Sequence, residues 1–338
     1  MPLRPPRRPS RSAGHCLAAI LAVLALPACT AIGIEENTFE SQPLPAISDE
    51  RVGQVLAALD SAVNEANAAR DPELLATVVA DPLLGVDVAA YALDSTADPE
   101  NVEPLPEVDH TDPTAFVPRF EGYPQWFVAA STVRPEAPLR LEVIGRDTAS
   151  APWILSLSTD LLADVEFPEL ALDSAGYVVP VAPSEQTALP RTVDEAAAAH
   201  AASLTGIDQP AGEPSAFAEE VWTTARRAAD AQRGEAVADA AQVQVSYEVT
   251  GVLPEVLETA DGGTLVFYAL AENVVYQVQP TYFLQLDEAT AALVGTAEIT
   301  MNLTERWAIQ LAVYLPPDAG GVARVIGARV DRVGLTGS

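Results

Sequence analysis

Apolar residues recur at helical spacing early in the chain and change to strand spacing further on. After Ser48 or Asp49 as the cap, apolar side chains from Val52 to Val63 return every three or four residues, which predicts a helix with one buried face. The sequence Asp71-Pro72-Glu73 predicts a second helix, because aspartate can cap it and proline fits its first turn. Three β-rich runs then predict an antiparallel meander, at 125–133, 139–144 and 153–158.

The second half repeats this order of helices and strands. Thr192 and Glu195 form a capping box before an alanine-rich helix. A further helix is expected from Ser215, with Val221 and Trp222 on its apolar face. The strand candidates that follow lie at 243–250, 264–268, 274–278, 296–303, 307–314 and 322–330.

These elements predict an α+β fold in which N-terminal helices pack on a curved antiparallel sheet, with the arrangement repeated in a second domain. We expect a cone-like helix-then-sheet domain at 48–162, a packed connector at 163–191 and a second helix-then-sheet domain at 192–338. An acidic stretch with four prolines, between Asp94 and Thr114, predicts an exposed loop.

The first 28 residues have the pattern of a signal peptide for export. Four arginines precede an uncharged apolar run that begins at Cys16 and ends in Leu26-Pro27-Ala28-Cys29. An uncleaved anchor is one alternative, since the uncharged run approaches the roughly 17 to 25 residues of a spanning helix. Pro27 argues against it, because proline interrupts a helix. An ordinary signal peptide is the other alternative.

The end of the leader resembles the lipobox of bacterial lipoproteins. That resemblance implies signal cleavage between Ala28 and Cys29 and lipidation of the Cys29 thiol by a diacylglyceryl group. Residues 29–47, which show no apolar periodicity, would then form a tether between the lipid and the folded body.

Charge separates the leader from the body. The chain contains no lysine, and after the leader 14 arginines stand against 48 acidic residues, a net charge of −34. Nucleic acid and anionic membrane surfaces repel such a body, so we expect no nucleic-acid partner and assign membrane contact to acyl chains on Cys29. With Cys29 acylated, no thiol remains for a disulfide, a metal or catalysis. We expect no cofactor.

No catalytic motif can be assigned. The sequence lacks a phosphate-loop lysine, Gly-x-Ser-x-Gly, Gly-x-Gly-x-x-Gly and His-Glu-x-x-His. His200, within the alanine-rich helix, is expected to be structural or solvated. His110 lies among Glu107, Asp109 and Asp112, which favours a solvated charge run, with a metal or general-base role as the alternative. We assign no catalytic and no metal-binding residue.

Aromatic residues of the first predicted domain are candidates for lining a ligand pocket. These candidates are Tyr123, Trp126 and Trp153, together with His110, and the alternative for the rings is a place in the core. Trp126 and Phe127 are adjacent, so they face opposite sides of a strand and at most one of them lines a pocket.

Helices followed by a curved antiparallel sheet resemble the cone-shaped nuclear transport factor 2-like fold. The lipobox and the stretches at 68–75 (Ala-Ala-Arg-Asp-Pro-Glu-Leu-Leu), 120–127 (Phe-Glu-Gly-Tyr-Pro-Gln-Trp-Phe) and 172–177 (Leu-Asp-Ser-Ala-Gly-Tyr) resemble secreted actinobacterial lipoproteins of unknown function. This resemblance implies a location at the extracytoplasmic face of the cell membrane, without an activity.

Three functions stay open. The favoured one is a lipid-anchored envelope protein that acts as a non-catalytic binding or scaffolding module for an unknown envelope protein or ligand. The second is small-molecule binding or enzyme activity in a cone-shaped pocket of the first domain. The third is weak calcium binding by the acidic surface. A deep cavity with a buried carboxylate, or with His110 pointing inward, would favour the second.

Overall fold

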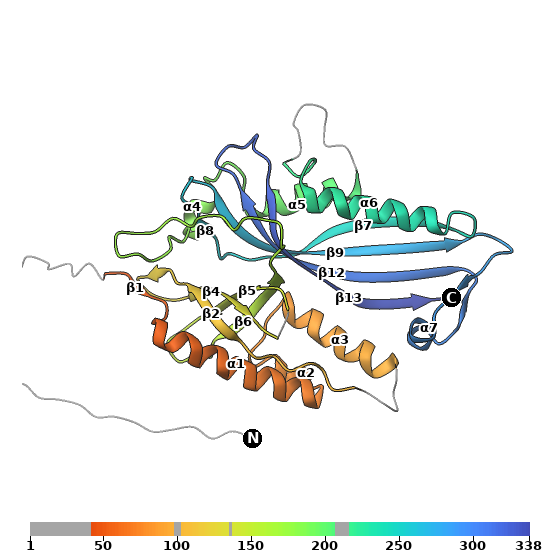
Figure 1. Ribbon diagram of the computed structural model, residues 1–338, viewed down its shortest axis with the longest axis horizontal. Helices are drawn as coiled ribbons and strands as arrows, with labels where there is room; N and C mark the ends of the chain where they lie inside the picture. The colour runs from red at the N-terminus through yellow and green to blue at the C-terminus, as the bar shows by residue number, and fades with distance from the viewer. Residues whose placement is uncertain (1–41, 98–102, 135–136, 207–215) are drawn as a thin grey trace, which may run out of the picture. The chain divides into compact units, whose positions relative to one another are not determined.

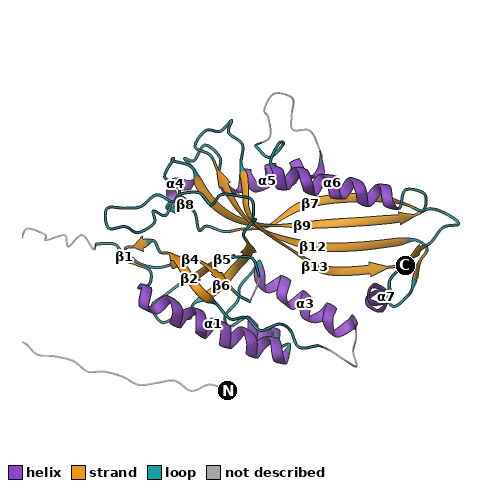
Figure 2. Ribbon diagram, viewed as in Figure 1, coloured by secondary structure: helices purple, strands orange, loops and turns teal. Residues whose placement is uncertain are grey.

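Two antiparallel sheets pack against each other, and helices cover the outer face of each sheet (Figure 1). The structure is a computed structural model, which describes residues 42–97, 103–134, 137–206 and 216–338. Residues 42–338 form one compact unit. Helices and strands both contribute to it (Figure 2), so the predicted α+β class is confirmed.

Within the described residues there are seven helices and thirteen strands. In chain order they are β1 (Leu44–Pro45), α1 (Asp49–Ala69), α2 (Pro72–Leu75), α3 (Leu83–Ala97), β2 (Thr111–Phe116), β3 (Arg119–Phe120), β4 (Gln125–Thr132), β5 (Arg140–Arg146), β6 (Ile154–Asp160), α4 (Pro183–Gln186), α5 (Val193–Thr205), α6 (Val221–Ala236), β7 (Ala241–Val252), β8 (Leu257–Glu258), β9 (Thr264–Val278), β10 (Leu284–Gln285), α7 (Glu288–Val294), β11 (Glu298–Ile299), β12 (Asn302–Leu315) and β13 (Arg324–Gly337).

The first sheet has the strand order β2-β4-β5-β6 and is the predicted antiparallel meander. The helices α1 and α2 on its outer face also begin where the sequence predicts. At α2 an Asp71 carboxylate oxygen accepts hydrogen bonds from the backbone nitrogens of Glu73 (2.9 Å) and Leu74 (3.1 Å). The third helix, α3, was not expected. It extends to Ala97, and β2 begins at Thr111, so the exposed loop predicted from 94 to 114 is wrong at both ends.

The second sheet has the strand order β13-β12-β9-β7, with β8 beside β9. The strand β9 runs without interruption through the two strands predicted at 264–268 and 274–278, because it pairs along its length with β7 on one side and β12 on the other. Pairing on both sides outweighs the low strand propensity of the alanines between these segments.

Helices α5 and α6 cover the outer face of the second sheet. The predicted capping box of α5 is confirmed, since Glu195 N donates to Thr192 Oγ1 (3.2 Å) and Thr192 N to Glu195 Oε2 (2.9 Å). Ser215, the expected start of the next helix, lies outside the described residues, and a turn precedes α6. The cap of α6 is Glu220, and Val221 is 79% exposed, so the predicted buried position of Val221 is wrong.

Alternate side chains of β4 enter different cores. Phe127 and Ala129 pack with α1, α2 and α3, whereas Trp126 and Val128 pack against the second sheet. This confirms that the two adjacent aromatic residues face opposite sides. Because both faces of the sheet are covered, residues 125–131 are all buried.

The core between the sheets is shared by the two halves of the chain. Leu157 of β6 meets Phe267 of β9 and Ile326 of β13 there, and the connector adds Leu170 and Val178. Both halves place helices before a meander, but a repeated-domain arrangement is not shown. The division into 48–162, 163–191 and 192–338 stays a prediction.

The end of the predicted tether belongs to the fold. The short strand β1 pairs with β3, and Ala46 and Ile47 after it are buried. Ala28 and Cys29 lie outside the described residues. No helix in the described part of the chain has the length and apolar character needed to cross a membrane.

Candidate functional site

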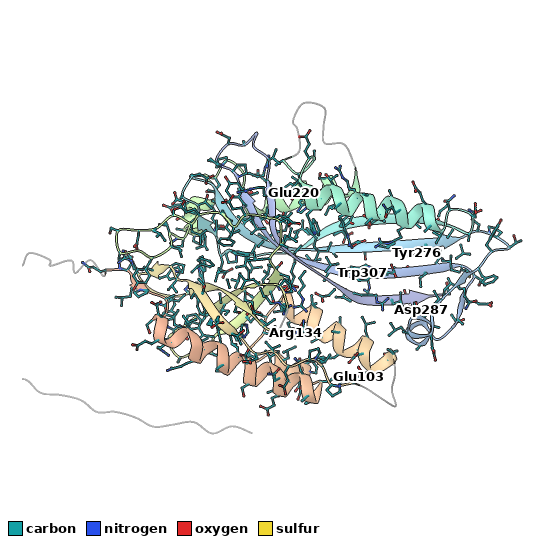
Figure 3. All side chains as sticks on the ribbon, viewed as in Figure 1. Glu103, Arg134, Glu220, Tyr276, Asp287 and Trp307 are labelled. Atoms are coloured by element: carbon teal, nitrogen blue, oxygen red, sulfur yellow. The ribbon has the colours of Figure 1, made fainter. Side chains whose placement is uncertain are left out.

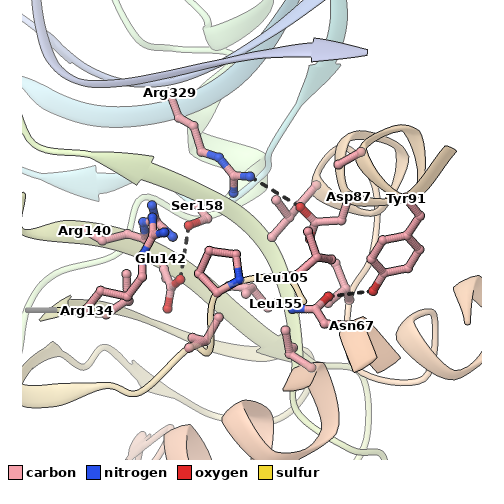
Figure 4. Close-up of a pocket in the computed structure, with 17 residues that line it drawn as sticks. Asn67, Asp87, Tyr91, Leu105, Arg134, Arg140, Glu142, Leu155, Ser158 and Arg329 are labelled. Atoms are coloured by element: carbon pink, nitrogen blue, oxygen red, sulfur yellow. Dashed lines mark hydrogen bonds and ion pairs between the residues drawn. The ribbon is translucent and has the colours of Figure 1, made fainter. Parts of the chain in front are cut away.

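A cavity of about 170 Å³ lies between the helical layer and the first sheet (Figure 4). We call it the Glu142 pocket. Its wall comes from α1, α3, the segment 105–108, the strands β5 and β6, and Arg329 of β13. An apolar cavity of about 150 Å³ is large enough to hold benzene. The pocket therefore has room for a small organic molecule.

One part of the wall is apolar. Val63 of α1, Leu83 of α3, Leu105 and Leu155 line it, and Leu83 is almost fully buried. Apolar surface that a ligand removes from water here stabilises the complex by roughly 25 cal/mol per Å². This side of the pocket suits a hydrocarbon group.

The polar part of the wall is centred on Glu142, which is only 2% exposed. Its Oε1 accepts a hydrogen bond from Ser158 Oγ (3.1 Å), the dashed line between these two side chains in Figure 4. Its Oε2 lies 2.5 Å from His110 Nε2. A buried carboxylate is costly without partners, so His110 and Ser158 make this position possible.

His110 joins Glu142 to the first helix. Its Nδ1 is bonded to Asp60 Oδ1, and its backbone nitrogen donates to Asp60 Oδ2 (3.0 Å). Burial lowers the pKa of His110, but the hydrogen bonds to Asp60 and Glu142 outweigh burial and raise the pKa to about 10. The ring is therefore an imidazolium at neutral pH and donates to both carboxylates. The expectation of a solvated charge run is wrong, because the His110 side chain is only 4% exposed.

Three arginines and Asp87 add further charges to the polar wall. Arg140 Nε donates to Asp160 Oδ1 (2.8 Å). Arg329 lies between two aspartates, with its Nε 2.8 Å from Asp331 Oδ2 and its Nη2 3.4 Å from Asp87 Oδ1. Burial raises the pKa of Asp87, and the positive charge of Arg329 opposes that rise. The pocket thus carries charges of both signs.

The far side of the pocket holds a neutral pair. Tyr91 of α3 donates its hydroxyl to Asn67 Oδ1 of α1 (2.7 Å), and Figure 4 shows both side chains across the pocket from Glu142. Burial raises the pKa of Tyr91 to about 12. The hydroxyl stays protonated, and the bond fixes the two helices that form this wall.

The predicted pocket aromatics lie elsewhere. Tyr123 is 42% exposed, Trp126 is buried between the sheets, and Trp153 packs edge-on against Phe127. The Arg146 guanidinium lies over the rings of Tyr123 (5.3 Å) and Trp153 (4.4 Å). Trp153 lines a separate hollow beside α1, and none of the three rings is part of the wall of the Glu142 pocket. A ligand role for these rings stays a prediction.

His200 is a buried structural residue. Thr223 Oγ1 donates to Glu220 Oε2 (2.8 Å), so it accepts from His200 Nε2 (2.9 Å). His200 Nδ1 then accepts from the Tyr268 hydroxyl (2.7 Å). Burial lowers the pKa of His200 to about 3, so the ring is neutral. Glu220, labelled at the start of α6 in Figure 3, ends this chain of hydrogen bonds.

The arrangement at the Glu142 pocket is suited to binding. His110 is protonated at neutral pH and has both ring nitrogens in use, so it is not a general base. The Ser158 hydroxyl donates to Glu142, and no histidine of the described ranges is bonded to it as a base. No group of three or more His, Cys, Asp or Glu side chains that could hold a metal ion occurs among the described residues.

Sequence reasoning missed Glu142, Asp87, Arg140 and Arg329. Glu142 alternates with Leu141 and Val143, and in an isolated strand that alternation indicates a solvent-facing side chain. Its face of the sheet is instead covered by helices. The only signal in the sequence was His110 itself, because a histidine can be a buried partner for carboxylates.

These features define an α+β protein with a half-buried, charged pocket beneath its first helices. The family model described as "Domain of unknown function (DUF8094)" matches residues 43–337, and the chain belongs to this family. The match covers nearly all of the described residues.

Two relatives from streptomycetes carry the word lipoprotein in their names. An "Uncharacterized lipoprotein" of Streptomyces avermitilis is 27% identical over 289 residues, which cover 85% of this chain and 84% of the relative. One of Streptomyces coelicolor is 29% identical over 268 residues, 78% of each chain. No solved structure matches. The predicted resemblance to actinobacterial lipoproteins is confirmed, and the nuclear transport factor 2-like fold stays a prediction.

Proposed function

We propose that this protein is anchored to the outer face of the cell membrane through lipid on Cys29 and that its body binds a small molecule in the Glu142 pocket. The anchor is supported by the leader and by the relatives, which are lipoproteins. Two or more acyl chains anchor a protein stably, whereas one binds marginally. The acidic body needs such an anchor, since anionic membrane surfaces repel it.

The observation that carries the binding function is a buried carboxylate in the wall of a cavity. A site meant only for stability is better filled by apolar side chains, because a buried ion pair adds little to stability. Here Glu142, Asp87 and Arg329 line open space instead. Small-molecule sites combine an apolar wall with a few placed polar groups, as this pocket does.

The anchor is tested by metabolic labelling with radioactive palmitate. The unmodified chain should carry label and sediment with membranes, and Cys29→Ala should lose both properties. The matched control is Cys16→Ala, since Cys16 belongs to the leader and should be dispensable for labelling. Labelled, membrane-bound Cys29→Ala protein would contradict the anchor.

The pocket is tested by NMR on the ¹⁵N-labelled body, residues 42–338, against a library of fragments of benzene size. Binders should shift amide signals of β5, β6 and α3. Ala90→Trp, which places a large ring in the wall, should abolish these shifts, and Ala58→Trp, in the separate hollow on α1, should leave them. If no fragment shifts the pocket signals, the binding function is wrong.

A further inference from the structure

Three of the 14 arginines of the body line one small pocket. Arg134 follows β4, Arg140 lies on β5 and Arg329 on β13, so separate parts of the chain bring them together. Figure 4 shows Arg134 and Arg140 on the Glu142 side of the pocket. Arg140 and Glu142 are two positions apart on β5, so their side chains share a face of the sheet.

The carboxylates of the pocket have partners, whereas several guanidinium nitrogens do not. Glu142 accepts from His110 and Ser158, and Asp87 faces Arg329. Arg140 uses its Nε for Asp160, and its two terminal nitrogens have no hydrogen bond within the described ranges. Arg134, which is exposed at the mouth, has no side-chain partner among the described residues. The hydrogen-bonding groups of the pocket that remain available to a ligand are therefore mainly donors.

Unused guanidinium donors beside a cavity are suited to a carboxylate. Arginine presents its N–H groups in a planar fork that matches two carboxylate oxygens. A cationic ligand would instead meet three guanidinium groups, while Glu142 is already bonded to the His110 imidazolium and Asp87 is already paired with Arg329. The overall negative charge of the body does not determine which ligand charge the pocket prefers, because salt screens charges beyond about 8 Å at physiological ionic strength.

We propose that the Glu142 pocket binds a small organic carboxylate. Its carboxylate lies between Arg134 and Arg140, and its apolar part lies against Val63, Leu105 and Leu155. The cavity of about 170 Å³ limits that apolar part to the size of about one benzene ring. This inference rests on the proposed function, namely that the pocket binds a small ligand at all.

The test is isothermal titration with three probes of one shape: benzoate, benzamide and benzylamine. Benzoate should bind with a Kd of about 1 mM, a normal value for so few atoms. Benzamide and benzylamine should bind at least tenfold more weakly. Equal affinity for benzamide, or a preference for benzylamine, would overturn the carboxylate class and leave the pocket function intact. If none of the three binds, the carboxylate class is overturned, and if the fragment library also fails, the proposed function is wrong as well.

Variants identify the donors. Arg134→Gln should weaken benzoate binding tenfold or more without a change in melting temperature, because Arg134 has no partner in the described protein to lose. Arg140→Gln should weaken it at least as much, with circular dichroism as the check on folding. The matched control is Arg191→Gln, whose guanidinium bonds the Ala319 carbonyl (3.0 Å) away from the pocket. An unchanged affinity in both Arg134→Gln and Arg140→Gln would overturn the assignment.

A carboxylate can come from a free acid or from the end of a peptide. A final titration compares benzoate with N-acetyl-phenylalanine, which also has one carboxylate and one benzene ring but joins them through a peptide-like frame. Tighter binding of benzoate indicates a free acid, and tighter binding of N-acetyl-phenylalanine a peptide terminus. Either result supports the proposal that the ligand is a carboxylate, and the absence of binding by both acids contradicts it.

Discussion

Glu142 Oε2 lies 2.5 Å from His110 Nε2, although the two residues are 32 positions apart in the chain. The other ring nitrogen of His110 is bonded to Asp60 of α1. One imidazolium thus connects the first helix to the middle of the first sheet. It also holds the carboxylate that lines the pocket.

Replacement of His110 by glutamine should destabilise the fold by about 3 to 5 kcal/mol. The change removes a positive charge and leaves two nearly buried carboxylates without their cationic partner, which is the costly way to break a buried pair. Urea unfolding of the body measures the loss. In the matched variant His110→Gln with Glu142→Gln, part of the stability should return, because one of the unpaired charges is gone. A loss below 1 kcal/mol for His110→Gln would contradict the imidazolium bridge.

The same residue should make the protein less stable at alkaline pH. The folded pKa of His110 is about 10, above its unfolded value of about 6.5. The folded protein therefore binds the extra proton between these values, and the stability that His110 contributes is complete below pH 6.5. It is lost as the pH rises towards 10, by at most about 1.4 kcal/mol per pH unit. Urea midpoints from pH 6 to 10 should fall, and in His110→Gln the slope should be flatter.

His200 should act in the opposite direction. Burial lowers its folded pKa to about 3, so between pH 6.5 and 3 the unfolded chain binds a proton that the folded protein excludes. The stability that the neutral ring contributes is present above pH 6.5 and decreases as the pH falls. NMR of the imidazole nitrogens provides the direct measurement. At pH 6.5 the His200 signal should be that of a neutral ring protonated at Nε2, and the His110 signal that of an imidazolium. A titration midpoint near 6.5 for either residue would contradict its assignment.

Local chemistry made part of this fold predictable. The caps at Asp71 and Thr192 depend on residues within three positions, and the strands at 125–133 and 153–158 depend on a short run of side chains. Each of these signals is local, because the residues that give it lie within one short segment of the chain. The α+β class follows from the order of such segments.

The pocket was not predictable in the same way. His110 meets Glu142 and Asp60 across gaps of 32 and 50 positions, and the strand pattern of Glu142 is that of a solvent-facing residue. Only the packing of α1 on the sheet reveals that this face is covered. The predicted pocket positions of the aromatic residues could not be checked from the sequence for the same reason. A large ring suits a pocket wall and a protein core equally well, and only the layer packed against its strand decides between them.

Two glycine variants should change stability in opposite directions. A Cβ at Gly263 would lie 2.5 Å from the Leu315 carbonyl oxygen and 2.9 Å from Thr259 Oγ1, so Gly263→Ala forces the backbone of two strands apart. It should cost about 1 to 3 kcal/mol. At Gly53, within α1, a Cβ would meet nothing within 4 Å, and Gly53→Ala should stabilise the helix by about 0.5 to 1 kcal/mol. Thermal unfolding of both variants tests the pair, and a stabilised Gly263→Ala would contradict the packing at that turn.

Removal of Glu272 of β9 should destabilise the protein far more than removal of a partly exposed acidic residue. Glu272 is fully buried and pairs with two arginines of α6, with Arg226 and with Arg233 Nη1 at 2.9 Å. It pairs in register with Trp307 of β12, and Tyr276 lies four positions further along β9; Figure 3 labels Trp307 and Tyr276. Glu272→Ala leaves both guanidinium groups without this partner and should cost about 3 to 5 kcal/mol.

The matched control is Asp94→Ala, which removes the acidic partner of Arg70 at a site where Asp94 is 41% exposed. It should cost less than about 1 kcal/mol, because water replaces the lost partner. Urea unfolding measures both losses. Equal losses of unfolding free energy in Glu272→Ala and Asp94→Ala would contradict the prediction that burial makes the Glu272 ion pairs more important.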